Sequence, residues 1–362
     1  MKPHIPEMLP VNSLNWMEFI HLIGEANREL ARYDGILKSI INPALLLTPF
    51  TTQEAVLSSR IEGTQATLEE VLEYEALPRK NGAKSQDIQE IINYRNALEY
   101  AVDYLKKKPI SLNLLKKIHC VLLDNVRGRN KARGQFRDKQ NYIGINGTPI
   151  EQASYIPPPP ERLMELLINL EKYIHTDEKD PLVQLAIVHA QFEIIHPFLD
   201  GNGRIGRILI PIFLMEKKLL SSPVFYMSAY LEAHRETYYD KLNVISKKKK
   251  WEDWITFFLE AVVEQAHKNS EKATSIIRLY NEMKERVHDV THSQHSILVL
   301  DLLFEKPLFS KAEFVKRLGI PRTSAVRILN ELVSNGILSV LQEGKAKRTS
   351  ILQFTELTRI VK

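Results

Sequence analysis

The chain has 362 residues, of which 44% are hydrophobic and 26% are charged, with a net charge of +5. This composition is typical of a globular protein and excludes a disordered, collagen-like or disulfide-framework chain, and the length predicts two or three folded units. Its single cysteine excludes an intrachain disulfide and a cysteine-built zinc site, which favours a reducing compartment such as the cytosol.

The positive charge is concentrated at the C-terminal end. Residues 296–362 contain 11 Lys and Arg against 6 Asp and Glu, whereas the preceding residues contain 38 of each sign. A basic C-terminal segment is compatible with a nucleic-acid partner for that segment alone. The N-terminal residues lack the apolar core of a signal peptide, and no stretch reaches the roughly 18–20 apolar residues of a membrane span. We therefore expect a cytoplasmic protein without a membrane segment.

Apolar residues spaced three and four apart predict a mainly α-helical protein. In the N-terminal region the pattern predicts a helix over residues 16–33. Pro and Thr residues then predict a break over 43–52, with a second helix beginning near Thr52. A further helix is predicted over 87–105. These helices together form one N-terminal unit.

Residues 134–160 differ in kind, because short β-type patches alternate with turn residues such as Asn146-Gly147. The pattern predicts a β-hairpin flap. The four prolines Pro157–Pro160 cannot continue a strand ladder and favour a helix that begins near Glu161. A polyproline peptide-recognition segment is the functional alternative for these prolines.

Two strongly apolar helices are predicted on either side of one short loop. Residues 181–195 are almost wholly apolar, which indicates a helix buried on nearly all sides, and a second apolar helix follows over 204–219. A helix over 251–265 then passes into a mixed-charge helical stretch over 271–287, which we interpret as a connector.

The C-terminal segment predicts a small domain of its own. An apolar helix begins at Ser296, and two further helices are joined by the tight turn Leu318–Pro321, which is a helix-turn-helix pattern. A β-hairpin with Gly344-Lys345 at its tip completes a winged helix. The basic residues that would suit DNA phosphates are Arg322, Arg327, Lys345, Lys347 and Arg348. Winged helices also serve as protein-interaction or dimerisation modules, so both kinds of partner remain open.

The predicted division of the chain is an N-terminal helical region (1–108), a core (109–265), a helical connector (266–290) and a winged-helix domain (291–362).

The most informative segment is the loop between the two apolar helices, HPFLDGNGRIGR, from His196 to Arg207. Two glycines flank Asn202, and the helix that starts there offers unpaired N–H groups, which favours phosphate binding. Arg204 and Arg207 lie three apart on one helical face, so both can contact the same oligophosphate. Asp200 supplies an oxygen ligand suited to Mg²⁺, and His196 is the candidate general base. A histidine or a Gly-Asn-Gly turn alone is usually structural, but the combination predicts a metal–nucleotide site.

This loop resembles the HPFxDGNGRxxR motif of the Fic (Fido) family and matches it at every specified position. The resemblance implies a helical core with a β flap, and transfer of AMP from ATP to a Tyr, Thr or Ser hydroxyl of a protein. It implies that His196 accepts the hydroxyl proton and that Asp200 holds Mg²⁺. The phosphate-binding groups that it implies are Gly201, Asn202, Gly203, Arg204 and Arg207. Because the related Doc-type kinases have lysine in place of Gly203, the glycine favours nucleotidyl transfer over phosphate transfer.

Two further segments resemble nucleotide-binding parts of the same family. The flap segment that contains Ala153, Ser154 and Tyr155 resembles the part that covers the nucleotide and docks the target as an added strand. Tyr238 and Tyr239, with Asn243 one turn later, resemble the lining of the adenine pocket, although aromatic pairs at this spacing are usually core residues.

The segment Ser58-Ser59-Arg60-Ile61-Glu62-Gly63 matches the family's inhibitory motif [ST]xxxE[GN]. The resemblance implies a salt bridge from Glu62 to Arg207, with Ser58 and Gly63 as the other fixed positions. Glu62 would occupy the arginine that the γ-phosphate otherwise contacts, so that ATP binds in a non-productive pose. An exposed helical glutamate is the ordinary alternative.

The preferred interpretation is an autoinhibited protein adenylyltransferase that uses ATP and Mg²⁺ and modifies a target protein, with the protein itself as one candidate. Two alternatives are a DNA-binding regulator with a nucleotide-sensing site, and a de-AMPylase in which Glu62 positions water. The resemblance is also compatible with a homodimer. His189 and His196 lack a third ligand, so we assign no zinc. Cys120 is expected to be a small buried side chain.

Overall fold

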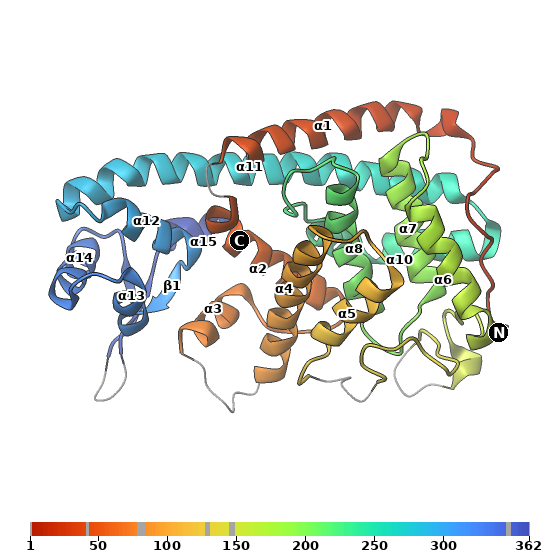
Figure 1. Ribbon diagram of the computed structural model, residues 1–362, viewed down its shortest axis with the longest axis horizontal. Coiled ribbons are helices and arrows are strands. Elements are labelled where there is room, and N and C mark those ends of the chain that lie inside the picture. Colours follow the sequence, from red (N-terminus) through yellow and green to blue (C-terminus); the bar gives the residue numbers. More distant parts are fainter. Residues whose placement is uncertain are drawn as a thin grey trace.

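A computed structural model describes residues 2–40, 43–77, 84–126, 131–144, 149–344 and 349–361, with only the backbone described for 43–47. The protein is mainly helical, as predicted, and the described residues include one three-stranded sheet (Figure 1).

The N-terminal region contains a short 3₁₀ helix η1 and four α-helices: η1 (Trp16–Glu18), α1 (Ile20–Ser39), α2 (Pro43–Ile61), α3 (Leu68–Ala76) and α4 (Ser85–Leu105). The predicted break over 43–52 is wrong, because α2 begins at Pro43 and continues through Pro49. Proline is tolerated at the start of a helix, and tertiary contacts of the next two residues with Tyr226 hold the helix beyond Pro49. One long helix therefore leads directly to the predicted inhibitory segment.

The core consists of six helices: α5 (Leu112–Leu122), α6 (Pro160–Ile174), α7 (Pro181–Ile195), α8 (Asn202–Glu216), α9 (Ser228–Ala233) and α10 (Arg235–Lys248). The prediction of a buried helix over 181–195 is confirmed, because 13 side chains of α7 are buried. The helix α7 packs against α6, α8 and α10, and Figure 1 shows it between α6 and α8. Cys120 is partly exposed rather than buried, because it falls at the edge of the α5 face that points inward.

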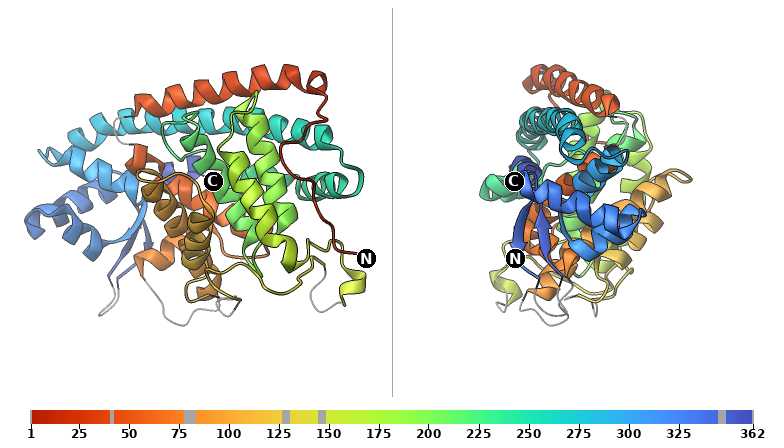
Figure 2. Two further views of the ribbon diagram at one scale, coloured as in Figure 1. Left: turned by 45° about the vertical axis from the view of Figure 1, so that its right-hand side comes forward. Right: turned by 90° about the vertical axis from the view of Figure 1, so that its left-hand side faces the viewer.

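The helix α11 (Trp251–Thr291) has 41 residues and lies alongside α1 for much of its length (Figures 1 and 2). The two helical segments predicted over 251–265 and 271–287 are parts of this single helix. It leads from the core helices to the C-terminal segment.

The C-terminal domain contains the predicted helix-turn-helix and hairpin. Its elements are α12 (Ser296–Glu305), β1 (Leu308–Ser310), α13 (Lys311–Leu318), α14 (Arg322–Ser334), β2 (Ser339–Gln342), β3 (Ile351–Gln353) and α15 (Thr355–Val361). The sheet is antiparallel with strand order β1-β3-β2. Gly319, with a φ of +66°, makes the turn between α13 and α14. The basic residues Lys345, Lys347 and Arg348 lie outside the described residues.

The predicted flap over 134–160 has little strand pairing. Its described residues form one antiparallel bridge, between Ile143 and Tyr155, and a 3₁₀ helix η2 (Ile150–Gln152). Asn146-Gly147 lies outside the described residues. A ladder does not extend past the bridge because the prolines that follow Tyr155 have no N–H donors. The helix predicted after them is confirmed, since α6 begins at Pro160.

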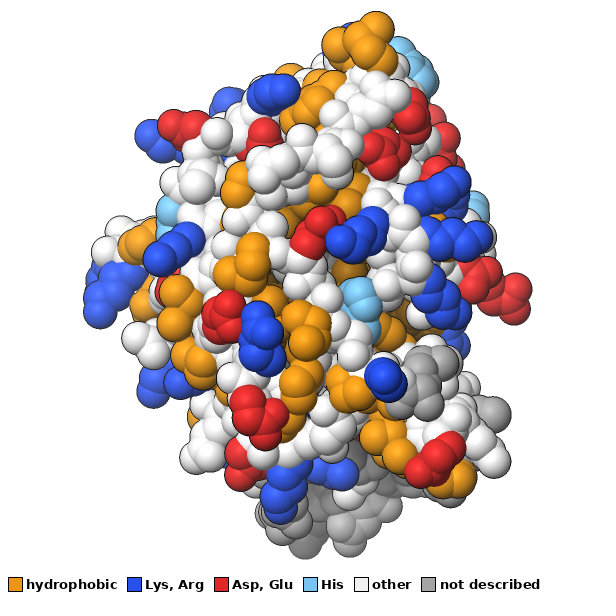
Figure 3. All heavy atoms as spheres, turned by 90° about the vertical axis from the view of Figure 1, so that its right-hand side faces the viewer, with side chains coloured by type: hydrophobic (Ala, Val, Ile, Leu, Met, Phe, Trp, Pro, Cys, Tyr) orange, Lys and Arg blue, Asp and Glu red, His pale blue; other side chains and the backbone are white. Residues whose placement is uncertain are grey.

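Figure 3 shows Lys and Arg side chains mixed with Asp and Glu over the face that lies at the right of Figure 1. Within the described ranges, no helix is both long and apolar enough to cross a membrane.

Candidate active site

The loop between α7 and α8 has a fixed shape that its own residues determine. His196 ends α7 with a φ of +50°, and Gly201 precedes α8 with a φ of +79°. The side chain of Asn202 closes the loop, because its Oδ1 accepts from the Phe198 N–H and its Nδ2 donates to the Phe198 carbonyl, both at 2.8 Å. Asn202 therefore shapes the loop rather than pointing into the site.

Arg137 joins the loop to the flap and was not singled out from the sequence. Its Nε donates to the His196 carbonyl at 2.9 Å, and its Nη2 donates to the Pro158 carbonyl at 2.6 Å. The side chain is buried. These bonds hold the flap against the end of α7, and a single arginine in an irregular segment carries no pattern that would have predicted them.

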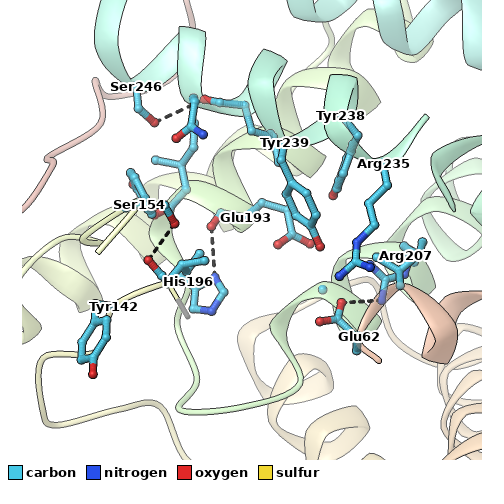
Figure 4. Close-up of a pocket in the computed structure, with 18 residues that line it drawn as sticks. Glu62, Tyr142, Ser154, Glu193, His196, Arg207, Arg235, Tyr238, Tyr239 and Ser246 are labelled. Carbon is cyan, nitrogen blue, oxygen red and sulfur yellow. Dashed lines mark hydrogen bonds and ion pairs between the residues drawn. The ribbon is translucent and has the colours of Figure 1, made fainter. Parts of the chain in front are cut away.

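A cavity of about 600 Å³ opens beside this loop (Figure 4). Nine predicted site residues line it: Glu62, Ser154, Tyr155, His196, Gly203, Arg207, Tyr238, Tyr239 and Asn243. The structure thus brings together residues from the segment predicted to be inhibitory, the flap, the loop and α10. Seven other predicted residues lie outside its lining: Ser58, Gly63, Ala153, Asp200, Gly201, Asn202 and Arg204.

His196 has the properties of a base. Burial lowers the pKa of its imidazole to about 4, so the ring is neutral at pH 7. Its Nδ1 lies 3.3 Å from the carbonyl oxygen of Glu193, which can only accept a hydrogen bond. Nδ1 is therefore the protonated nitrogen and Nε2 the nitrogen that can accept a proton.

Arg207 is held by the segment predicted to be inhibitory, and the predicted salt bridge is present. Its Nη2 lies 2.7 Å from Glu62 Oε1, and the same group donates to the Ser58 carbonyl at 2.9 Å. Its Nε donates to Ser58 Oγ at 2.8 Å. Burial alone would raise the pKa of Glu62, but the charge of Arg207 outweighs it and lowers that pKa. Glu62 is therefore ionised and paired at neutral pH, and Gly63 ends the segment with a φ of +98°.

Gly203 leaves the space that Glu62 occupies. A Cβ atom at this position would lie 2.2 Å from Glu62 Oε1 and 3.0 Å from Arg207 Nη1. A side chain at position 203 would therefore displace the Glu62 carboxylate from its observed position against Arg207.

Asp200 and Arg204 lie together on the other side of the loop. Arg204 Nη2 is 3.4 Å from Asp200 Oδ1, and Arg204 Nη1 is 3.5 Å from Glu90 Oε2 on α4. Thr64, just after the inhibitory motif, donates to Glu90 Oε2 at 3.1 Å. In the described ranges no three His, Cys, Asp or Glu residues form a metal-binding group. A single partly exposed carboxylate such as Asp200 still fits Mg²⁺ that is shared with substrate phosphates and water.

One wall of the cavity is formed by α10. Tyr238 is buried, and its hydroxyl lies 3.0 Å from His189 Nε2, whose Nδ1 lies 3.1 Å from the Gly206 carbonyl. Tyr239 is 38% exposed and faces the cavity. The other α10 residues that line the cavity were not predicted from the sequence; they are Arg235, Leu242 and Ser246. Their three- and four-residue spacing from Tyr238, Tyr239 and Asn243 was the available signal.

Comparison with known proteins identifies the family. The family model described as "Fic/DOC family N-terminal" matches residues 20–103, and that described as "Fic/DOC family" matches residues 109–214. The chain belongs to the Fic/DOC family. Both matched ranges contain motifs quoted above, since the first includes Glu62 and the second includes the loop from His196 to Arg207.

Curated members of the family share part of their length with this chain. A probable protein adenylyltransferase of Aquifex aeolicus is 29% identical over 197 residues, which cover 54% of this chain and 56% of that protein. A protein adenylyltransferase Fic of Culex quinquefasciatus is 31% identical over 175 residues, which cover 46% of this chain and 31% of that protein. The chain thus spans just under a third of one of these relatives and somewhat over half of the other.

Solved structures of family members share the fold. A Fic family protein from Desulfovibrio desulfuricans aligns with a TM-score of 0.61 at 20% identity, covering 98% of both chains. The C. elegans protein Fic-1 aligns with a TM-score of 0.53 at 20% identity, covering 73% of each chain. The resemblance noted from the loop motif is confirmed at the level of the fold.

Proposed function

We propose that this Fic/DOC protein is a protein adenylyltransferase that transfers AMP from ATP to a Tyr, Thr or Ser hydroxyl of a target protein, and that Glu62 holds it in an inhibited state. One observation carries the proposal: a neutral His196 and a buried Arg207 line the same cavity beside the start of α8, and Glu62 is bound to that arginine. Relatives named protein adenylyltransferase support the same activity.

The residues around the cavity suit each part of this reaction. His196 Nε2 accepts the proton of the attacking hydroxyl, whose oxygen bonds to the α-phosphorus as the bond to the leaving pyrophosphate breaks. The N–H groups of Gly201 and Gly203, near the start of α8, and the Arg207 guanidinium stabilise negative charge on the phosphates. Mg²⁺ bound by Asp200 would neutralise further phosphate charge.

Glu62 opposes this reaction by occupying Arg207. A γ-phosphate needs the same guanidinium, so the triphosphate can adopt its productive pose only after the salt bridge opens. The flap residues Ser154 and Tyr155 border the cavity and are the proposed docking edge for the target chain. The modification of a target protein, the formation of a homodimer and the cytoplasmic location remain predictions.

The label that ATP transfers distinguishes this reaction from a kinase reaction. ATP that is radiolabelled on the α-phosphate should label the protein. ATP that is radiolabelled on the γ-phosphate should not, because the γ-phosphate leaves as part of pyrophosphate. Labelling from the γ-phosphate alone would contradict the proposal. Removal of AMP by the same site is tested by incubation with a pre-AMPylated protein, which would lose its label.

We propose DNA binding by the C-terminal domain as a second function. The exposed face of α14 presents Arg322, Thr323, Arg327 and Asn330 along one open hollow. Arginine and asparagine are the side chains that most often contact bases from a helix in the major groove. Arg327 also donates to the Thr291 carbonyl at 3.1 Å, so it links this face to the end of α11.

Substitution of Arg322 tests this surface. We expect the full chain to bind a fluorescent DNA duplex with an affinity that falls as salt rises, and Arg322→Ala to weaken binding roughly 5- to 100-fold, measured by anisotropy. Arg162→Ala, on α6, is the matched control and should leave the affinity unchanged. Equal affinities for the Arg322→Ala and Arg162→Ala variants, or absence of binding, would overturn this second function.

A further inference from the structure

Glu193 lines the same cavity but has no role in the reaction described above. It lies on α7, one turn before His196, and Figure 4 shows its carboxyl pointing towards Tyr239. Within the described part of the chain, its Oε1 atom is buried and has no hydrogen-bond partner. A buried oxygen without a hydrogen-bond partner is unfavourable, so a polar ligand in the cavity would be the natural partner.

The first turns of α8 have room for two carboxyl groups side by side. A Cβ atom at Gly206 would lie 2.2 Å from Glu193 Oε1, just as a Cβ atom at Gly203 would lie 2.2 Å from Glu62 Oε1. Gly203 and Gly206 are three residues apart and therefore neighbours on one helical face. Glu62 and Glu193 thus cover adjacent positions on α8, close to Arg207. A phosphate that replaces Glu62 on Arg207 comes next to Glu193.

Several charged or titratable groups surround the Glu193 carboxyl. They are Glu62 just after α2, Arg207 of α8, Tyr238 and Tyr239 of α10, His189 of α7, and His196 at the end of α7. Burial raises the pKa of Glu193 to about 8, with Arg207 opposing the rise and Glu62 adding to it. The carboxyl therefore carries its proton at pH 7 and has an O–H donor, whereas an ionised carboxylate would repel a phosphate.

We propose that Glu193 is a nucleotide-binding residue whose protonated carboxyl donates a hydrogen bond to a phosphate oxygen of the nucleotide held by Arg207. This inference rests on the proposed function, because it needs a nucleoside triphosphate in the cavity. It makes nucleotide binding depend on one proton: the nucleotide binds tightly to the enzyme with neutral Glu193 and weakly to the enzyme with ionised Glu193. Glu193 then selects the protonation state in which the cavity accepts a phosphate chain.

Calorimetry can count that proton. The Glu62→Gly protein is titrated at pH 8 with Mg²⁺ and α,β-methylene-ATP, which cannot transfer its adenylate, in two buffers of different ionisation enthalpy. Loss of the Glu62 charge lowers the pKa of Glu193, so the free protein should bind nucleotide with uptake of up to about one proton. The Glu62→Gly, Glu193→Gln protein should bind the nucleotide without this proton uptake. The matched control carries Glu165→Gln, at an exposed position, in the Glu62→Gly protein and should show the same proton uptake as the Glu62→Gly protein.

A kinetic measurement gives an independent reading. Between pH 7 and 9 the KM for ATP of the Glu62→Gly protein should rise, by at most about tenfold per pH unit, whereas with Glu193→Gln it should stay level because the amide always has a donor. Binding with equal proton uptake in both proteins would overturn the role of Glu193 and leave the proposed function intact. Absence of nucleotide binding in all the variants would overturn the proposed function itself, and this inference with it.

Discussion

Replacing Glu62 by glycine should increase self-AMPylation on the order of 100-fold. The substitution removes the carboxylate that lies 2.7 Å from Arg207 Nη2, while both hydrogen bonds that this arginine donates to Ser58 can remain. A hydrogen bond between charged groups contributes about 1.5–3 kcal/mol, which corresponds to roughly 10- to 150-fold in the population of the productive complex. The measurement is the initial rate of protein labelling by ATP that is radiolabelled on the α-phosphate.

Two controls separate charge from backbone effects. Glu73→Gly introduces glycine at an exposed position of α3 and should leave the rate unchanged. Glu62→Gln keeps the shape of the side chain without its charge, so it should increase the rate by less than Glu62→Gly. An unchanged rate for Glu62→Gly, with protein that remains folded, would show that this salt bridge does not limit the reaction.

Replacing His196 by alanine in the Glu62→Gly protein should reduce transfer about 10²- to 10⁴-fold, the usual contribution of a general base. Nucleotide binding should persist, because Arg207 and the start of α8 are unchanged. Alanine at the exposed His21 is the matched control and should have no effect. A decrease below tenfold would mean that His196 is not the base.

The pH dependence gives a second test of His196. Burial lowers the pKa of its imidazole to about 4, and only the neutral ring can accept a proton. Transfer should therefore not fall as the pH is lowered from 8 to 6, and should be lost only as the pH approaches 4. A loss centred near pH 6.5, the ordinary value for histidine, would show that His196 is exposed to water in the active protein.

Sequence patterns predicted the helices well where hydrophobic spacing decides the structure. The buried helix α7 and the helix-turn-helix are both present, since each needs an apolar face or a turn glycine that the sequence shows directly. The break expected over 43–52 failed because proline is a local signal, and tertiary contacts of α2 override it. Strand pairing in the flap was overestimated for a related reason, because turn residues alone do not fix a ladder.

The site was predictable only as far as its residues belong to contiguous motifs. His196, Arg207 and Glu62 were singled out on that basis, and the structure brings all three to one cavity. Glu193 and Arg137 were not, because their importance depends on which segments the fold brings together. The structure also changes the role expected for Asn202, whose side chain closes the loop. The sequence alone does not distinguish an asparagine that binds phosphate from one that closes a loop.

Intact-mass spectrometry of the purified Glu62→Gly protein after incubation with ATP and Mg²⁺ tests the central claim most directly. We predict that the mass increases by one or more AMP groups, that fragmentation places each group on a Tyr, Thr or Ser hydroxyl, and that the increase is absent in the Glu62→Gly, His196→Ala protein. An unchanged mass, or an increase by phosphate alone, would contradict the account.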